Sequence, residues 1–273
     1  MSGEVARPPL DEAYLHTIVT SSDTSWRRIE VVEQTRSTNA DLLARAAAGE
    51  HIDGVVLIAE HQTAGRGRGG RSWSGLPRAS ITMSVGVEVG HVPTGAWGWL
   101  PLAAGVAVVD TVAVTGIKAG LKWPNDVLAG DGKLAGILAE VSPRQPAVVV
   151  GIGLNVTLRR SEIDEPATSL AELGVAAPDR NSLVRRLLEN LGARIVDWRS
   201  VGGADDRLRG DYLARSLTVG SRVRALLPGE REIVGVASAI DAQGRLCIES
   251  GGQTIAVAAG DVVHLRPAGN PER

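Results

Sequence analysis

The spacing of apolar residues changes near residue 215, and this change constrains the fold of the 273-residue chain more than any other feature. On the C-terminal side the period is close to two, which is typical of strands with one buried face. Turn sequences such as the Pro-Gly-Glu of residues 228–230 separate these strands. The segment therefore predicts a small β-barrel, with strands at residues 222–227, 232–240, 245–249, 254–258 and 262–265.

Before that boundary, helical and strand-like segments alternate irregularly, which predicts an α+β (mixed α/β) fold for the larger part of the chain. An expected helix starts at Thr38 and Asp41, which have the spacing of a capping box. Further helices are expected at residues 96–114 and 182–198, and strands near residue 29 and at residues 55–59, 81–87, 121–128, 134–141 and 147–156. We divide the chain into an N-terminal arm (1–25), the larger domain (26–214), the barrel (215–268) and a tail (269–273).

Charge and cysteine content exclude several classes of protein. The 29 basic and 31 acidic side chains leave a formal charge of −2, so no overall positive field exists to hold nucleic acid or an anionic membrane. One cysteine, Cys247, excludes an intrachain disulfide, and the N-terminus lacks the pattern of a signal peptide. The apolar run from Trp97 to Val109 is too short to span a bilayer. We expect a cytoplasmic protein that binds neither nucleic acid nor membrane.

The segment from Gly65 to Ser72, with the sequence GRGRGGRS, is the most unusual in the chain. It matches GxGxxG, and it differs from a Walker A sequence only in having Arg71 where lysine is expected. Both motifs need a helix after the last glycine, and the residues up to Pro77 are not compatible with one. We therefore expect a flexible loop whose arginines bind phosphate or carboxylate, with Trp73 stacking on a base. The alternative is a solvated surface loop.

Lysine is rare in this chain: only Lys118, Lys122 and Lys133 are found among the 29 basic residues. Lys133 lies beside an apolar strand, which favours a site that needs a compact ammonium group rather than a planar guanidinium group. The sequence KWPND of residues 122–126 places Asn125 and Asp126 at a turn. Each of these residues could also be structural, either as a turn signal or as a solvated charge at a strand end.

The sequence GIGLN of residues 151–155 is a third candidate. Two glycines two residues apart on one face of a strand let a ligand approach the backbone, and Asn155 supplies a donor and an acceptor. The alternative here is a β-bulge near a sheet edge. The five histidines do not have the spacing of metal ligands, so we expect no dedicated metal site.

In combination, these motifs resemble those of the biotin protein ligases, also called biotin–[acetyl-CoA-carboxylase] ligases. Any one motif is weak, but five in the same order are highly specific. The resemblance extends from about residue 30 to residue 265 and implies a mixed sheet with helices, related to class II aminoacyl-tRNA synthetases, followed by an SH3-like barrel. It rests on residues 37–39 (STN), 62–71 (QTAGRGRGGR) with Trp73, 122–126 (KWPND), 133–138 (KLAGIL) and 151–155 (GIGLN).

The resemblance also implies a reaction and a role for each matching residue. Biotin and ATP, with Mg²⁺, would give biotinoyl-5′-AMP and pyrophosphate, and biotin would then pass to a lysine of a biotin carboxyl-carrier domain of acyl-CoA carboxylase. The catalytic residues would be Lys133, Arg68 and Arg66. The biotin-binding residues would be Ser37, Thr38, Asn39, Gln62, Gly65, Arg66, Gly67, Arg68, Lys133, Gly136 and Gly151. The residues that bind ATP and the adenylate would be Arg66, Arg68, Arg71, Trp73, Asn125, Asp126, Lys133 and Asn155.

Three other functions fit the sequence less well. A lipoate ligase or octanoyltransferase shares the fold, but the complete Gly/Arg segment and the barrel favour biotin. An RNA-binding protein with Arg-Gly repeats would need a longer and unfolded segment. A biotin sensor without activity would not need Lys133 and the arginines. Some members of the family also carry an N-terminal helix-turn-helix domain, and we expect none here because about 25 residues before the first strand are too few to form one.

Overall fold

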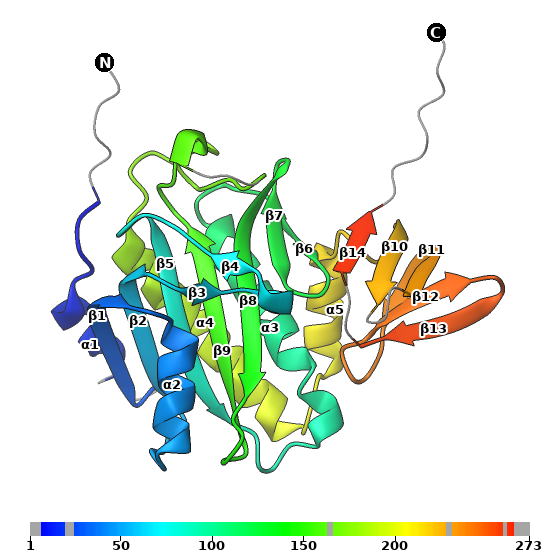
Figure 1. Ribbon diagram of the computed structural model, residues 1–273, viewed down its shortest axis with the longest axis horizontal. Helices are drawn as coiled ribbons and strands as arrows, with labels where there is room; N and C mark the ends of the chain where they lie inside the picture. Colours follow the sequence, from blue (N-terminus) through cyan, green and yellow to red (C-terminus); the bar gives the residue numbers. More distant parts are fainter. Residues whose placement is uncertain (1–6, 20–24, 163–165, 228–230, 259–260, 265–273) are drawn as a thin grey trace, which may run out of the picture.

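Figure 1 shows the computed structural model of the chain, which describes residues 7–19, 25–162, 166–227, 231–258 and 261–264. Among these residues a large sheet is built from β1 (Arg28–Thr35), β2 (Val55–Gln62), β5 (Ser80–Glu88), β6 (Ala119–Lys122), β7 (Asp126–Ala129), β8 (Gly132–Val141) and β9 (Ala147–Asn155). The strand order is β1-β2-β5-β9-β8-β7-β6, with β1 and β2 parallel and the other neighbours antiparallel. This mixed sheet with helices confirms the expected fold class.

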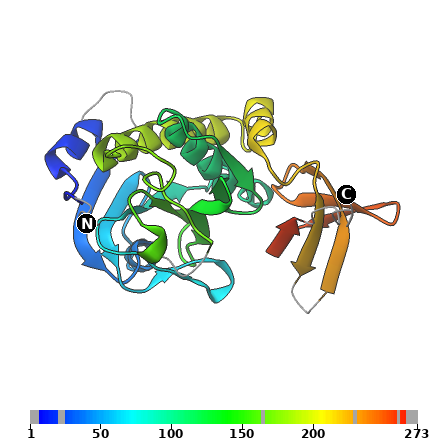
Figure 2. The ribbon, with the colours of Figure 1, turned by 90° about the horizontal axis from the view of Figure 1, so that it is seen from above.

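Helices cover both faces of this sheet (Figures 1 and 2). Side chains alternate along a strand, so Val56 and Ile58 of β2 face the larger hydrophobic core while Val55 and Leu57 face the smaller one. Helix α2 (Thr38–Ala47) packs on the smaller core. The helices that contribute to the larger core are α1 (Glu12–Val19), α3 (Trp99–Ala113), α4 (Arg180–Ser200) and α5 (Asp206–Arg215).

Helix α3 is the helix expected at residues 96–114, and nearly every side chain in it is buried. The stretch Thr94–Ala113 is long and apolar enough to cross a membrane, but most of it is buried within the fold. A central core helix has the same composition, because it must be apolar on all sides. We therefore assign this stretch to the core.

The start of α2 differs by one residue from the expected capping box. Ser37 is the N-cap, and its side chain accepts a hydrogen bond from the backbone N–H of Ala40. Thr38 is therefore the first helical residue, and Asp41 instead accepts a hydrogen bond from the hydroxyl of Thr35 at 2.5 Å. Because Thr38 is not used as the cap, its hydroxyl is available to the polar network described below.

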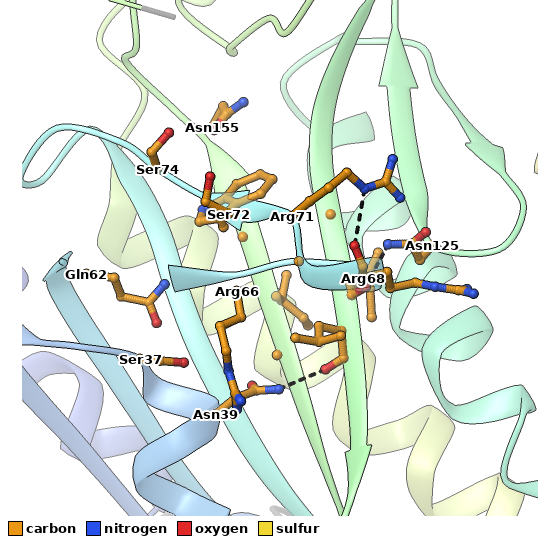
Figure 3. Close-up of a pocket in the computed structure, with 18 of the residues that line it drawn as sticks. Ser37, Asn39, Gln62, Arg66, Arg68, Arg71, Ser72, Ser74, Asn125 and Asn155 are labelled. Carbon is orange, nitrogen blue, oxygen red and sulfur yellow. Dashed lines mark hydrogen bonds between the residues drawn. The ribbon is translucent and has the colours of Figure 1, made fainter. Parts of the chain in front are cut away.

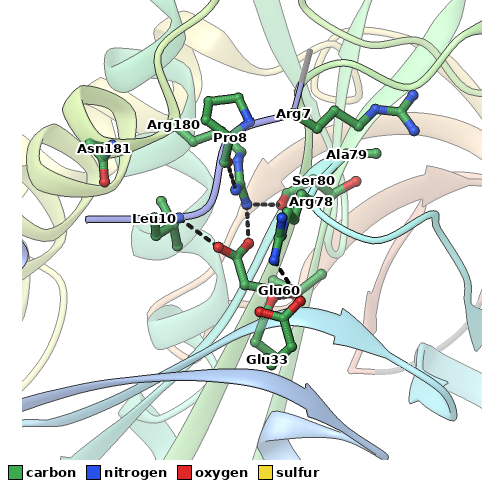
Figure 4. A network of polar contacts seen from close by, with 12 residues as sticks. Arg7, Pro8, Leu10, Glu33, Glu60, Arg78, Ala79, Ser80, Arg180 and Asn181 are labelled. Carbon is green, nitrogen blue, oxygen red and sulfur yellow. Dashed lines mark hydrogen bonds and ion pairs between the residues drawn. The ribbon is translucent and has the colours of Figure 1, made fainter. Parts of the chain in front are cut away.

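The N-terminal segment is more structured than the arm predicted for residues 1–25. Residues 12–19 form α1, and Leu15 and Ile18 are buried in the larger core. The segment that precedes α1 is held by a buried ion pair between Glu60 and Arg180, whose closest atoms lie 2.5 Å apart (Figure 4). The expectation of an arm failed here because the few apolar residues of a one-face helix give a weak periodic signal.

A second, antiparallel sheet has the strand order β13-β12-β11-β10-β14. Each expected strand is present within one residue of its predicted bounds. The strands are β10 (Arg222–Leu227), β11 (Arg231–Ile240), β12 (Leu246–Ser250), β13 (Gln253–Val257) and β14 (Asp261–His264). In Figure 1 this sheet lies beyond the β6 edge of the large sheet.

The turn between β11 and β12 connects the two sheets. The indole N–H of Trp99 donates to the backbone oxygen of Asp241 at 3.0 Å, and that of Trp123 donates to Gly244 at 3.1 Å. The backbone N–H of Trp123 also donates to the hydroxyl of Thr218 at 3.0 Å.

Residues 121–128 were expected as one strand. They form two, because a turn with a cis Trp123–Pro124 peptide separates β6 from β7.

Candidate active site

A cavity of about 310 Å³ brings the predicted motifs together on one face of the large sheet (Figure 3). Its lining includes every predicted site residue except Gly65 and Asp126, which are adjacent to lining residues in sequence. The predicted residues that line it are Ser37, Thr38, Asn39, Gln62, Arg66, Gly67, Arg68, Arg71, Trp73, Asn125, Lys133, Gly136, Gly151 and Asn155. The lining residues that were not named as site residues are Ser72, Ser74, Met83, Ile137, Leu138, Ile152, Gly153, Leu158, Glu162 and Ala167.

One end of the cavity is a buried network of polar side chains at the start of α2. The side-chain oxygen of Gln62 accepts hydrogen bonds from the backbone N–H and the hydroxyl of Thr38, at 2.8 and 3.0 Å. Ser84 is hydrogen-bonded to the Thr38 hydroxyl at 2.6 Å and donates to the side-chain oxygen of Asn39 at 2.5 Å. Because its polar groups are partnered in this way, the network presents donors and acceptors in fixed positions.

Glu140 carries the charge at this end. Its carboxylate accepts hydrogen bonds from the side-chain amide of Asn39 at 2.8 Å and from the guanidinium group of Arg66 at 3.0 Å. The sequence motifs indicate neither Ser84 nor Glu140, because each of these residues lies inside a strand and belongs to no motif. Only the pairing of β5, β9 and β8 brings them to Asn39.

The Gly/Arg segment is a short hairpin rather than the loop expected from the sequence. Strand β3 (Gly65–Arg66) pairs with β4 (Ser72–Trp73), and the N–H of Gly67 donates to the backbone oxygen of Arg71 at 2.7 Å. The tip of the hairpin turns at Gly69 and Gly70, whose φ angles are +63° and +78°, values that other residues rarely adopt. The hairpin brings all three arginines to the cavity.

Trp73 packs against the glycines of β8 and β9. A Cβ atom at Gly153 would clash with its indole ring, and a Cβ atom at Gly136 would lie 3.1 Å from the ring. A Cβ atom at Gly151 would likewise clash with the side chain of Asn39. The sequence predicts that Gly136 and Gly151 let a ligand reach the backbone, whereas in the structure protein side chains fill these positions.

Lys133 lies at the junction of the hairpin and the large sheet. Its Nζ is 2.7 Å from a carboxylate oxygen of Asp126 and 5.7 Å from the centroid of the Trp73 ring. The side chain is about one-third exposed, and the backbone of Lys133 is fixed by hydrogen bonds to Pro166 and Thr168. Asp126 therefore contacts the predicted catalytic lysine and does not itself line the cavity.

Asn125 and Asn155 are held by backbone groups in different parts of the cavity wall. The side-chain amide of Asn125 donates to Ile137 at 3.0 Å, and that of Asn155 donates to Thr168 at 3.0 Å. Figure 3 shows Asn39 and Asn155 at opposite ends of the site, Arg66 beside Asn39, and Asn125 on the side of Arg68 and Arg71. Within the described residues, no group of three His, Cys, Asp or Glu side chains is placed to hold a metal ion.

Comparison with known proteins identifies the family. Residues 31–156 match the model of the biotin/lipoate A/B protein ligase family, and residues 218–265 match that of the biotin protein ligase C-terminal domain. A biotin–[acetyl-CoA-carboxylase] ligase of Mycobacterium tuberculosis is 62% identical over 264 residues, which cover 95% of this chain and 97% of the relative. The chain belongs to the biotin protein ligase family. The resemblance seen in the sequence motifs is thereby confirmed.

More distant members of the biotin protein ligase family are also similar to this chain in sequence and in structure. The bifunctional ligase/repressor BirA of Escherichia coli is 35% identical over 79% of this chain and 67% of its own length. A biotin protein ligase from Aquifex aeolicus, solved in complex with biotin and ATP, superposes with a TM-score of 0.75. It is 26% identical, and the match covers 89% of this chain and all of that structure. The similarity therefore includes both sheets of the fold.

Proposed function

We propose that this chain is an ATP-dependent ligase that activates biotin as biotinoyl-5′-AMP and transfers it to one lysine of a biotin carboxyl-carrier domain of acyl-CoA carboxylase. The observation that supports this function most directly is that one cavity joins a buried polar network to three arginines, Lys133 and Trp73. Such a cavity has groups for an uncharged polar ring, for phosphates and for a base.

We assign the two ends of the cavity to the two substrates. The network of Ser37, Thr38, Asn39 and Gln62 suits the ureido group of biotin, which needs both donors and acceptors. Trp73, Asn125 and Asn155 are assigned to the adenylate, with Trp73 offering a face for stacking. Asn125 and Asn155 act here mainly by holding the backbone that borders the nucleotide, because their amides already donate to Ile137 and Thr168.

The lysine and arginines in the middle of the cavity reduce the electrostatic repulsion that opposes the first step. The biotin carboxylate must attack an α-phosphate that is itself negative, and two unit charges about 4 Å apart repel by about 4 kcal/mol at an effective dielectric constant near 20. We assign Lys133, which lines the cavity, to bridge the carboxylate and the α-phosphate, and we assign Arg66, Arg68 and Arg71 to offset the charge of the other phosphates. The bond between the α- and β-phosphates breaks, and pyrophosphate leaves.

Mg²⁺ is expected to bind together with ATP. The ion supplies charge neutralisation on the phosphates when it is bound with the nucleotide. Magnesium in such sites takes most of its ligands from phosphate oxygens and water, with one or two carboxylates. The described residues fit that pattern, since no group of three His, Cys, Asp or Glu side chains among them is placed to hold a metal ion, and phosphate oxygens and water would supply most of the ligands.

In the second step the amine of the acceptor lysine attacks the carbonyl of the mixed anhydride, and AMP leaves. The mixed anhydride hydrolyses readily, so the β3–β4 hairpin beside it has a protective role. The single cysteine and the balanced charge also support action in the cytoplasm, on a protein rather than a nucleic acid.

The proposed activity predicts a specific pattern of labelling. With labelled biotin, ATP, Mg²⁺ and a biotin carboxyl-carrier domain, label should appear on the carrier, and omission of any one component should abolish it. Pyrophosphate should be released even without the carrier, because activation precedes transfer. Faster labelling with lipoate or octanoate than with biotin would show that the substrate is wrong.

A change at Gly153 tests the position of Trp73. In Gly153→Ala the added methyl group would occupy the place of the indole ring, so Trp73 must move away from β9. We expect the KM for ATP, measured by pyrophosphate release, to rise about 10-fold, which corresponds to the loss of one stacking contact. Gly210→Ala is the matched control, because a Cβ atom at Gly210 in α5 meets nothing within 4 Å. Unchanged ATP kinetics in Gly153→Ala would mean that Trp73 does not pack there during catalysis.

A further inference from the structure

Arg7 belongs to none of the motifs and still contacts the wall of the cavity. Its Nε donates to the hydroxyl of Thr157 at 3.2 Å, and its Nη2 donates to the backbone oxygen of Thr157 at 3.1 Å. The same Nη2 donates to the carboxylate of Glu162 at 2.6 Å. One guanidinium group thus joins two points of the segment that follows Asn155, and Glu162 in that segment lines the cavity.

Glu162 is held in its charged form by these contacts. Burial raises the pKa of Glu162, but hydrogen bonds from the backbone N–H of Arg159 and from Arg7 lower it more, so the pKa lies below its usual range. Only about one-quarter of the side chain is exposed. A carboxylate therefore faces a cavity in which we place the phosphates of ATP, and Arg7 is the cation that contacts it.

The backbone that follows Arg7 is fixed by the buried ion pair Glu60–Arg180 (Figure 4). The guanidinium group of Arg180 donates to the backbone oxygen of Pro8 at 2.6 Å, and the carboxylate of Glu60 accepts from the N–H of Leu10 at 2.6 Å. Leu10 is itself buried in the larger core. The position of Arg7 is therefore determined by contacts with the core.

We infer that Arg7 is a positioning residue for ATP: it fixes the 157–162 segment at the adenylate end of the cavity and offsets the charge of Glu162 toward the phosphates. This inference rests on the proposed function. The guanidinium group holds Thr157 and Glu162 together through Nη2 and makes a third contact through Nε, which a single ammonium nitrogen in the place of Nη2 could not make. Without Arg7, the carboxylate of Glu162 would lose its ion pair and keep the backbone hydrogen bond from Arg159, so more of its negative charge would face the triphosphate and ATP would bind more weakly.

The test compares variants by pyrophosphate release at varied ATP and biotin. Arg7→Ala should raise the KM for ATP about 10-fold and leave the KM for biotin and kcat within twofold, because the biotin end lies across the cavity. Arg7→Lys should raise the KM for ATP about threefold. Arg28→Ala is the matched control, since Arg28 pairs with Glu30 and Glu50 on the surface and should leave both KM values unchanged.

A double variant separates positioning from general stability. Removing the charge of Glu162 in Arg7→Ala/Glu162→Gln should bring the KM for ATP back to within about threefold of wild type, although it adds no structural support. An unchanged KM for ATP in Arg7→Ala, or equal rises in the KM for ATP and for biotin, would overturn the inference. Failure of the wild-type chain to release pyrophosphate from ATP with biotin would instead overturn the proposed function.

Discussion

Replacing Lys133 by arginine is expected to slow the activation of biotin by about 100-fold while the protein stays folded. The ammonium group of Lys133 is a compact donor 2.7 Å from Asp126 and close to the face of Trp73. A guanidinium group keeps the charge but is larger and planar, so it cannot occupy the same point between carboxylate and α-phosphate. The rate of pyrophosphate release at saturating biotin and ATP measures this effect.

Lys118→Arg is the control for this substitution, because Lys118 is exposed and lies outside the cavity. This substitution should change the activity and the stability of the protein very little. The competing interpretation, in which Lys133 is only a solvated charge at a strand end, expects both variants to behave alike. Equal rates in Lys133→Arg and Lys118→Arg would therefore remove Lys133 from the catalytic residues.

The largest effect on stability is expected for Arg180→Met. This change leaves the carboxylate of Glu60 buried without its partner, and breaking a buried ion pair from one side typically costs about 3–5 kcal/mol. The side chains of Glu60 and Arg180 are 2% and 5% exposed, so solvent screens the pair very little. Urea unfolding should show the loss, and for a chain of this size it corresponds to a fall in Tm of about 10 °C.

Two further variants make this result specific. Arg207→Met removes a guanidinium group that is 78% exposed and should change stability by no more than about 0.5 kcal/mol. Glu60→Gln combined with Arg180→Met removes the unpaired charge and keeps an acceptor for the N–H of Leu10, so it should regain at least part of the loss. A single variant as stable as wild type would show that the ion pair does not hold the N-terminal segment.

The features that were predicted from sequence are those with a local signal. The strands of the second sheet alternate apolar and polar residues and are bounded by turn sequences, so their limits were found within one residue. The motif residues of the cavity were recognised because rare types such as Lys133 and Trp73 occur beside glycines and turns. Their positions along the chain, however, did not show that Asp126 would pair with Lys133, because that contact depends on the register of β7 against β8.

Contacts between distant segments account for most of what was missed. Ser84 and Glu140 are ordinary polar residues of strands, and only the sheet order brings both to Asn39. The segment preceding α1 depends on Glu60 and Arg180, which are 120 residues apart in the chain. The sequence of ten or twenty neighbouring residues does not indicate a contact with a residue that lies so far away in the chain.

The docking of the β11–β12 turn on Trp99 and Trp123 has a consequence for how this protein unfolds. The two indole N–H groups find their acceptors only in the second sheet, so separation of the sheets would leave both donors unpaired next to an opened core. The two sheets should therefore melt in one cooperative transition rather than as independent units. Damage confined to the C-terminal strands, none of whose described residues lines the cavity, would then reach the cavity residue Asn125 and its neighbour Asp126, which directly follow Trp123 and Pro124.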